Sequence, residues 1–156
     1  MDDRTVKHLE FIQNAIVRMN TNSFQIKKIA ITIIAALLAL YASSNNFVYL
    51  FIAIVPTIIF WCLDAYYLQQ ERKFRGVYDD VSELTEIEAR IIVRLFEMPL
   101  HKYTSEKYSY WNALWSSTTK PIYLFAIIFF LIFALTVLFS QYVTLCFIFE
   151  NRSVGE

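Results

Sequence analysis

Residues that break helices or permit unusual backbone conformations are scarce in this chain of 156 residues, which has two glycines and three prolines. This scarcity excludes a collagen-like repeat, a linker-rich array and a chain rich in disordered segments. Charged residues are also few, at 18%, whereas 57% of the residues are hydrophobic. Soluble domains have about 25% charged and about 45–50% apolar residues, so the composition is shifted away from that class.

Groups that carry out chemistry are equally rare. The only cysteines, Cys62 and Cys146, lie in long apolar runs, so we expect thiols that face a core or lipid rather than a zinc site. The only histidines, His8 and His101, lie far apart in the sequence, and we expect both to face solvent. The chain contains no glycine-rich phosphate loop and no G-x-S-x-G or H-E-x-x-H motif. We therefore expect no enzymatic activity, no metal and no cofactor.

Three long apolar runs are present instead. The first two lie in residues 29–63, which we predict to form a transmembrane hairpin with helical spans at about 27–43 and 47–63. Residues 121–149 form the third. A helix needs roughly 20 residues to cross the hydrocarbon core, so the first run is long enough only if two lysines at its start reach back to the headgroups. The polar turn Ser43-Ser44-Asn45-Asn46 makes the first two spans an antiparallel hairpin.

Basic residues are distributed unevenly along the chain. Residues 1–28 carry five and residues 64–120 carry eight, whereas the hairpin turn has none and only Arg152 follows the third run. The positive-inside rule places the first two segments in the cytoplasm and residues 150–156 outside as a short tail. The fold class predicted is an all-α membrane protein with three transmembrane helices and a small cytoplasmic helical layer.

The segment 1–28 has the periodicity of an amphipathic helix. Apolar residues recur at spacings of three and four, at Leu9, Ile12, Ile16 and Met19. The polar cluster at residues 20–23 is expected to interrupt this helix before the first span.

The cytoplasmic segment 64–120 is expected to be helical. The second span has no helix breaker at its end, so its helix should continue to about Gly76, and Asp79-Asp80 should serve as turn or cap residues. Thr85 and Glu88 have the spacing of a capping box, which predicts a helix with one apolar stripe, made of Ile87, Ile91, Ile92, Leu95 and Phe96. Pro99 should end it. A last short helix around residues 109–117 should carry Trp111 and Trp115 on one face before the third span, at the level of an aromatic belt.

Five basic residues are dense near the cytoplasmic ends of the first two spans. They are Lys27, Lys28, Arg72, Lys73 and Arg75. Such residues can fix topology by contact with anionic lipid, neutralise the phosphates of a nucleotide or oligonucleotide, or contact a neighbouring subunit. The sequence leaves all three roles open, and we take the five as candidate contacts for an anionic ligand.

Two residues of the second helix are candidates for the pore and its gating. Asp64 is an ionisable group at a membrane boundary, where such groups either emerge among the headgroups or line an ion path. Pro56 lies within the span and should kink the helix, either as a packing feature or to let the helix move. Three spans cannot enclose a water path in one protomer, so a channel would need a symmetric homo-oligomer.

Two stretches resemble a known family. They are Lys7 to Lys27 (KHLEFIQNAIVRMNTNSFQIK) and Phe60 to Val81 (FWCLDAYYLQQERKFRGVYDDV). The chain resembles small anti-phage membrane effectors of bacteria, the SLATT-type and two-transmembrane pore formers, and most of all the channel effectors of Hailong-type systems. It departs from that pattern at Lys27-Lys28, where a lysine followed by a small residue and an aromatic residue is expected.

The resemblance implies a function that the residues alone do not give. It implies a pore-forming channel of the bacterial inner membrane, controlled by a nucleotide or single-stranded oligonucleotide that a partner nucleotidyltransferase makes. Opening would depolarise the membrane and stop growth of the infected cell. The alternative, from a different class, is a non-conducting membrane anchor or adaptor that recruits a soluble partner.

Overall fold

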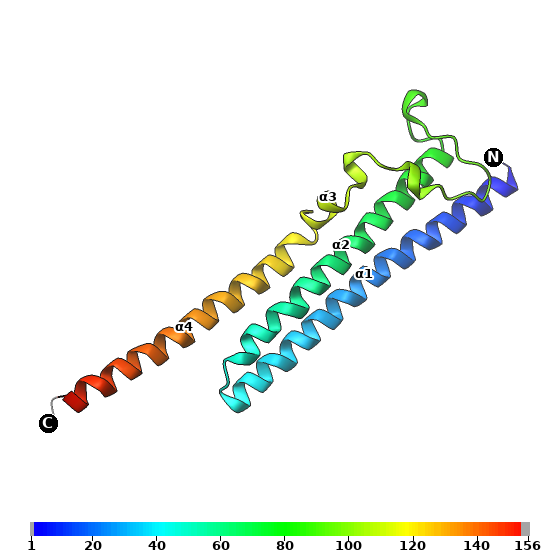
Figure 1. Ribbon diagram of the computed structural model, residues 1–156. Coiled ribbons are helices and arrows are strands. Elements are labelled where there is room, and N and C mark those ends of the chain that lie inside the picture. Colours follow the sequence, from blue (N-terminus) through cyan, green and yellow to red (C-terminus); the bar gives the residue numbers. More distant parts are fainter. Residues whose placement is uncertain (1, 154–156) are drawn as a thin grey trace. The chain divides into compact units, whose positions relative to one another are not determined.

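The structure is a computed structural model that describes the backbone of residues 2–153 and the side chains of residues 2–144. The described backbone has no strand, and its elements are α1 (Asp3–Ser44), α2 (Val48–Val81), η1 (Ile87–Ala89), η2 (Leu100–Lys102), η3 (Glu106–Tyr108), α3 (Tyr110–Leu114) and α4 (Lys120–Ser153), where η marks a 3-10 helix (Figure 1). The all-α prediction is therefore confirmed.

Three of these helices are long and apolar enough to cross a membrane. They are α1, α2 and the part of α4 from Lys120 to Thr144, which is the most apolar of the three. The chain is thus a membrane protein by the length and composition of its helices. The predicted third span lies within α4, which also includes residues 150–153 of the predicted tail. Residues 154–156 and the side chain of Cys146 lie outside the described part.

The chain divides into two compact units. Unit 1 comprises Met1–Ile29 and Phe60–Lys120, and unit 2 comprises Ala30–Ile59 and Pro121–Glu156. Unit 1 holds most of the charged residues, and unit 2 holds most of each apolar run.

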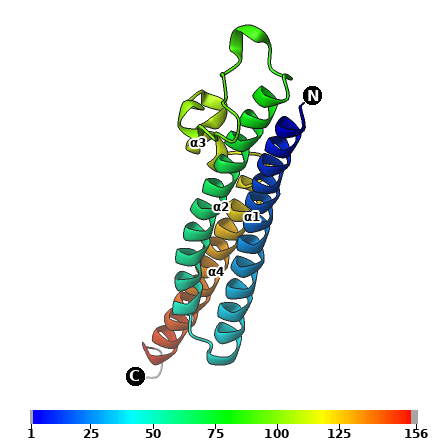
Figure 2. The same cartoon turned by 90° about the vertical axis from the view of Figure 1, so that its right-hand side faces the viewer.

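Unit 2 has an apolar core shared by its helices. Leu50 and Ala53 of α2 and Phe130 and Ala134 of α4 are buried in one cluster, with partly buried residues of α1 packed against it. A turn is present between the two helices, but it is shifted from the predicted residues 43–46 to residues 45–47, because α1 ends at Ser44 and α2 begins at Val48 (Figure 2). Asn46 caps α2 by accepting the N–H of Val48 at 3.0 Å.

Two further features of unit 2 fit a lipid environment. The described part of α4 exposes large apolar side chains, of which Phe125, Leu135 and Phe139 are each more than 60% exposed. In a membrane these faces meet lipid rather than water. α2 is continuous through Pro56. The neighbouring Thr57 donates its buried hydroxyl to the carbonyl of Ala53 at 2.7 Å, so this polar group has a partner within the helix and needs no water.

The core of unit 1 joins three segments. Ile12, Ala15 and Ile16 of α1 pack against Phe74 and Val77 of α2, and Tyr103 of the segment that follows η2 completes the cluster. The apolar stripe predicted in the segment 1–28 is thus confirmed at Ile12, Ile16 and Met19, and its partner is α2 of the same chain. Burial of such a cluster stabilises unit 1 by roughly 1.5–3 kcal/mol for each large side chain.

Three expectations about unit 1 are wrong. The polar residues 20–23 do not interrupt α1, because Ser23 finds a buried polar partner on α2 and the helix continues past it. α2 ends at Val81 rather than near Gly76, so Asp79 and Asp80 belong to its last turn. His8 is buried rather than exposed, with Nε2 lying 3.2 Å from the carbonyl of Glu97 and its ring beside Phe96.

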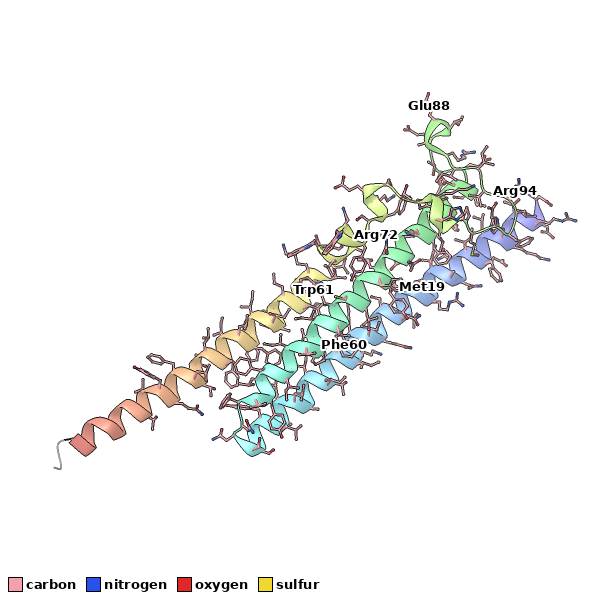
Figure 3. The ribbon with its side chains drawn as sticks, viewed as in Figure 1. Met19, Phe60, Trp61, Arg72, Glu88 and Arg94 are labelled. Carbon is pink, nitrogen blue, oxygen red and sulfur yellow. The ribbon has the colours of Figure 1, made fainter. Side chains whose placement is uncertain are left out.

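The predicted capping-box helix is also absent. The 82–99 loop contains only η1, and Ile87 and Ile92 are 87% and 84% exposed. A contact with α2 replaces part of the helix, since the N–H of Ile91 donates to Asp80. The backbone of Phe96, with a positive φ of 62°, also departs from a helical conformation. Tertiary contacts of this kind commonly override a local helix propensity. Figure 3 shows Glu88 at the tip of this loop, away from the long helices.

Gly76 lets the segment around η2 and η3 approach α2 closely. A Cβ at this position would lie 2.5 Å from Tyr108 Oη and 2.8 Å from ring atoms of Tyr103, which is well inside van der Waals contact. We expect Gly76→Ala to lower the free energy of unfolding by about 1–2 kcal/mol, because the overlap outweighs the gain in helix propensity. Denaturation in detergent micelles measures the change.

A second substitution tests the cause of that effect. Tyr108→Phe in the Gly76→Ala background removes the nearest atom and should recover part of the loss. A Gly76→Ala variant as stable as the wild type would show that the aromatic residues do not pack against α2 as described.

Candidate anionic-ligand site

Basic residues meet at a cavity in unit 1. Arg72, Arg75 and Asp79 lie on one face of α2, since their spacing of three and four residues is that of successive helical turns. The cavity has a volume of about 500 Å³ and is lined by Gln13, Ile16, Arg72, Arg75, Tyr78, Asp79 and Lys107. We call it the basic cavity. Its size is typical of a site for a small ligand.

The charge of the basic cavity favours an anion. Three cations line it against the single carboxylate of Asp79. Arg75 is also paired with Glu71, 2.7 Å away, but its side chain stays 60% exposed. Clustered lysine and arginine side chains are what neutralisation of phosphates requires.

Arg72 links the basic cavity to α3. Figure 3 labels Arg72 on α2. Its two terminal nitrogens donate to Asn112 Oδ1 in α3 and to Ser116 Oγ just after α3, each at 2.9 Å. These bonds fix the guanidinium, so less conformational entropy is lost when it binds a ligand. A second hollow of about 640 Å³ shares Arg72 and Lys107 with the basic cavity and adds Glu106 and Asn112. The two cations therefore border both spaces.

Two hydrogen bonds to α2 hold the segment that carries Lys107. Tyr103 donates its hydroxyl to Asp80 at 2.6 Å, and Gln69 donates to the carbonyl of Tyr108 at 2.9 Å. Burial, with the hydrogen bond to Asp80 and its negative charge, raises the pKa of Tyr103 well above its usual 10. Burial also raises the pKa of Tyr108. Tyr103 is thus a stable proton donor that anchors this segment to α2.

The structure gathers only two of the five predicted basic residues at this site. Arg72 and Arg75 line the basic cavity, whereas Lys73, on the same helix, does not. Lys28 is exposed, and its Nζ lies 4.6 Å from the centre of the Phe24 ring. Lys107 is the residue that sequence reasoning missed, because nothing in the local pattern at Glu106-Lys107-Tyr108 indicates that the chain returns to α2 there.

Lys27 has a different partner. Its Nζ lies 2.7 Å from both carboxylate oxygens of Asp64, and Ser23 donates a hydrogen bond to the same carboxylate. Asp64 is fully buried, so its carboxylate is shielded from solvent by the protein itself. We call Lys27 and Asp64 the boundary pair, because Lys27 lies where the first predicted span begins and Asp64 directly follows the end of the second. Its charges are satisfied within the chain, which makes Lys27 a poor contact for an external ligand.

The fold and the basic cavity together define the class: an all-helical membrane protein with a basic cavity in its polar unit. Comparison of the chain with known protein families, curated proteins and solved structures finds no match. Within the described residues, no group of three histidine, cysteine, aspartate or glutamate side chains is placed to hold a metal ion.

Proposed function

We propose that this protein is a pore-forming ion-channel effector of bacterial anti-phage defence, controlled by an anionic ligand in the basic cavity. The ligand class is a nucleotide or a short single-stranded oligonucleotide, made by a partner nucleotidyltransferase. The channel acts in the inner membrane, as a homo-oligomer, and depolarises the cell when it opens. The observation that carries the proposal is the basic cavity itself, with Arg72, Arg75 and Lys107 around a space large enough for a phosphorylated ligand.

The connection of the cavity to the membrane supports control by a ligand. Gln13 and Ile16 belong to the same uninterrupted helix as the first span, and Arg72 and Arg75 to the same helix as the second. A ligand that draws α1 and α2 together, or spreads them, would act directly on helices that enter the membrane. Coupling of this kind requires only that the ligand bind one arrangement of the helices better than the other.

The side of the membrane follows from charge. The segments 1–28 and 64–120 hold thirteen of the fourteen lysine and arginine residues, which favours the cytoplasm for both and the outside for the carboxyl terminus. The basic cavity then faces the compartment in which nucleotides are made. The exposed apolar faces of α4 leave room for both lipid and neighbouring copies of the chain.

Ion flux through liposomes that contain the purified protein tests the proposal. We expect a flux that short oligonucleotides switch on or off when they are added on the side that carries residues 1–28, and no response when they are added on the other side. A folded and inserted protein that gives no flux under any condition would contradict the channel.

A second function has its own supporting observation. Leu84, Ile87 and Ile92 in the 82–99 loop are each more than 70% exposed, outside the apolar runs. Exposed apolar residues of this kind are typical of sites that bind another protein. A non-conducting anchor that recruits a soluble partner would show partner binding through this loop and no flux in the same liposomes.

A further inference from the structure

The short helix α3 and the residue that follows it place two tryptophans on the surface of unit 1. Trp111 and Trp115 are 68% and 55% exposed, whereas Ala113 and Leu114 on the opposite side are buried. Leaving such large aromatic surfaces in water gives up roughly 1.5–3 kcal/mol for each side chain. An exposed pair therefore needs an environment other than bulk water.

The depth of α3 is fixed by contacts with α2. The indole N–H of Trp61 donates to the carbonyl of Leu114 at 3.1 Å, and the Tyr110 hydroxyl donates to the carbonyl of Cys62 at 3.1 Å. The rings of Trp61 and Trp115 also meet edge to face, 5.8 Å apart. α3 thus lies level with residues 61 and 62, which are among the last residues of the second apolar run.

The sequence of α2 changes at that level from apolar to polar, as it does where a helix leaves the hydrocarbon core. The apolar run 47–63 of α2 ends there, and Asp64 follows it directly. The third apolar helix also begins close by in sequence, because α3 is followed by Lys120 and Pro121 at the start of α4. Tryptophan and tyrosine prefer this interfacial layer, where an apolar ring and a polar group can both be satisfied.

The charge next to the tryptophans fits the same layer. Lys120 is exposed, and its Nζ lies 5.4 Å from the centre of the Trp115 ring. A lysine beside an interfacial aromatic residue can reach lipid phosphates while its stem covers apolar surface. Trp111, Trp115 and Lys120 together form what we call the α3 surface.

We propose that the α3 surface binds phospholipid headgroups, so that α3 lies in the interfacial layer and fixes the depth of unit 1 in the membrane. The occupant is the lipid of the membrane that the three long helices cross. The surface also reaches the basic cavity, because Asn112 and Ser116, next to the two tryptophans in sequence, bind Arg72. This inference does not depend on whether the protein conducts ions or binds a nucleotide.

Fluorescence quenching on the full-length protein tests it. The protein is placed in vesicles of phosphatidylethanolamine and phosphatidylglycerol that contain lipids with a quenching group near the headgroup or deep in the acyl chain. The contributions of Trp111 and Trp115 are obtained by difference from Trp111→Phe and Trp115→Phe variants, with Trp61 retained in each. We expect the shallow group to quench both tryptophans more strongly than the deep group does. Aqueous iodide should quench them severalfold less than it quenches free tryptophan.

A matched control carries the same number of tryptophans. Trp111→Phe combined with Phe96→Trp moves one indole to the 82–99 loop, where Phe96 is 57% exposed, and iodide should quench it freely. Ready quenching of Trp111 and Trp115 by iodide would overturn the proposal by placing them in water. Protection from iodide and from both quenching groups would overturn it by showing that a second copy of the protein covers the tryptophans. Stronger quenching by the deep group would overturn it by placing α3 in the hydrocarbon core.

Discussion

Replacing Lys27 by methionine is expected to lower the free energy of unfolding by about 3–5 kcal/mol, because it leaves a buried carboxylate without its counter-charge. Asp64 is 0% exposed, and Lys27 Nζ contacts both of its oxygens at 2.7 Å. After the substitution, the hydrogen bond from the Ser23 hydroxyl would remain, but it carries no positive charge. Unfolding in detergent micelles, followed by circular dichroism, measures the loss.

Lys28 provides the matched control for this prediction. It is the next residue of α1 and carries the same charge, but it is exposed and lies over the Phe24 ring. We expect Lys28→Met to change the free energy of unfolding by less than about 1 kcal/mol, as is usual for surface charges. Equal effects of the two substitutions would show that the boundary pair does not hold α1 to α2.

The double variant separates the charge from the packing. Lys27→Met with Asp64→Leu removes both members of the boundary pair, so no buried charge is left alone. Replacing a buried ion pair by apolar residues of similar volume is often close to neutral. We expect this variant to recover most of the stability lost in Lys27→Met, and a double variant that is less stable still would contradict an electrostatic origin.

Neutralising the basic cavity is expected to abolish most of its affinity for an anionic ligand. Each hydrogen-bonded charge contact contributes about 1.5–3 kcal/mol. Lys107→Gln should therefore weaken binding about tenfold, and Lys107→Gln with Arg75→Gln about 100-fold, since each 1.4 kcal/mol is a factor of ten. The anisotropy of a fluorescently labelled short single-stranded oligonucleotide gives the affinity, and its dependence on salt concentration gives the number of phosphates that each variant still neutralises.

Two further variants make this result specific. Lys73→Gln removes the same charge from the same helix outside the basic cavity and should leave the affinity unchanged. Arg75→Lys keeps the charge next to Glu71 and should retain most of the binding. A Lys107→Gln and Arg75→Gln variant that remains folded and binds like the wild type would place the ligand elsewhere, even if the protein conducts ions.

The sequence by itself determined the features that depend on local composition and period. A helix in lipid must be apolar over about 20 residues, so the three runs were visible without any knowledge of the fold. The turn at residues 43–46 and the stripe through Ile12 and Ile16 followed in the same way, from polar residues in a short gap and from a helical repeat. The continuation of α2 beyond the membrane boundary was predicted because no breaker occurs before Gly76, although it runs on to Val81.

The tertiary structure decided which charged residues have partners within the chain and which line a cavity. Lys27 and Arg72 look alike in the sequence, yet one is paired with Asp64 and the other lines the basic cavity. The same applies to Lys107, which joins the site because Tyr103 and Gln69 hold its segment against α2. The helix predicted from the capping box at Thr85 and Glu88 is absent for the same reason. Contacts between residues distant in sequence outweigh local propensities of a few tenths of a kcal/mol per residue, and no local pattern reports them.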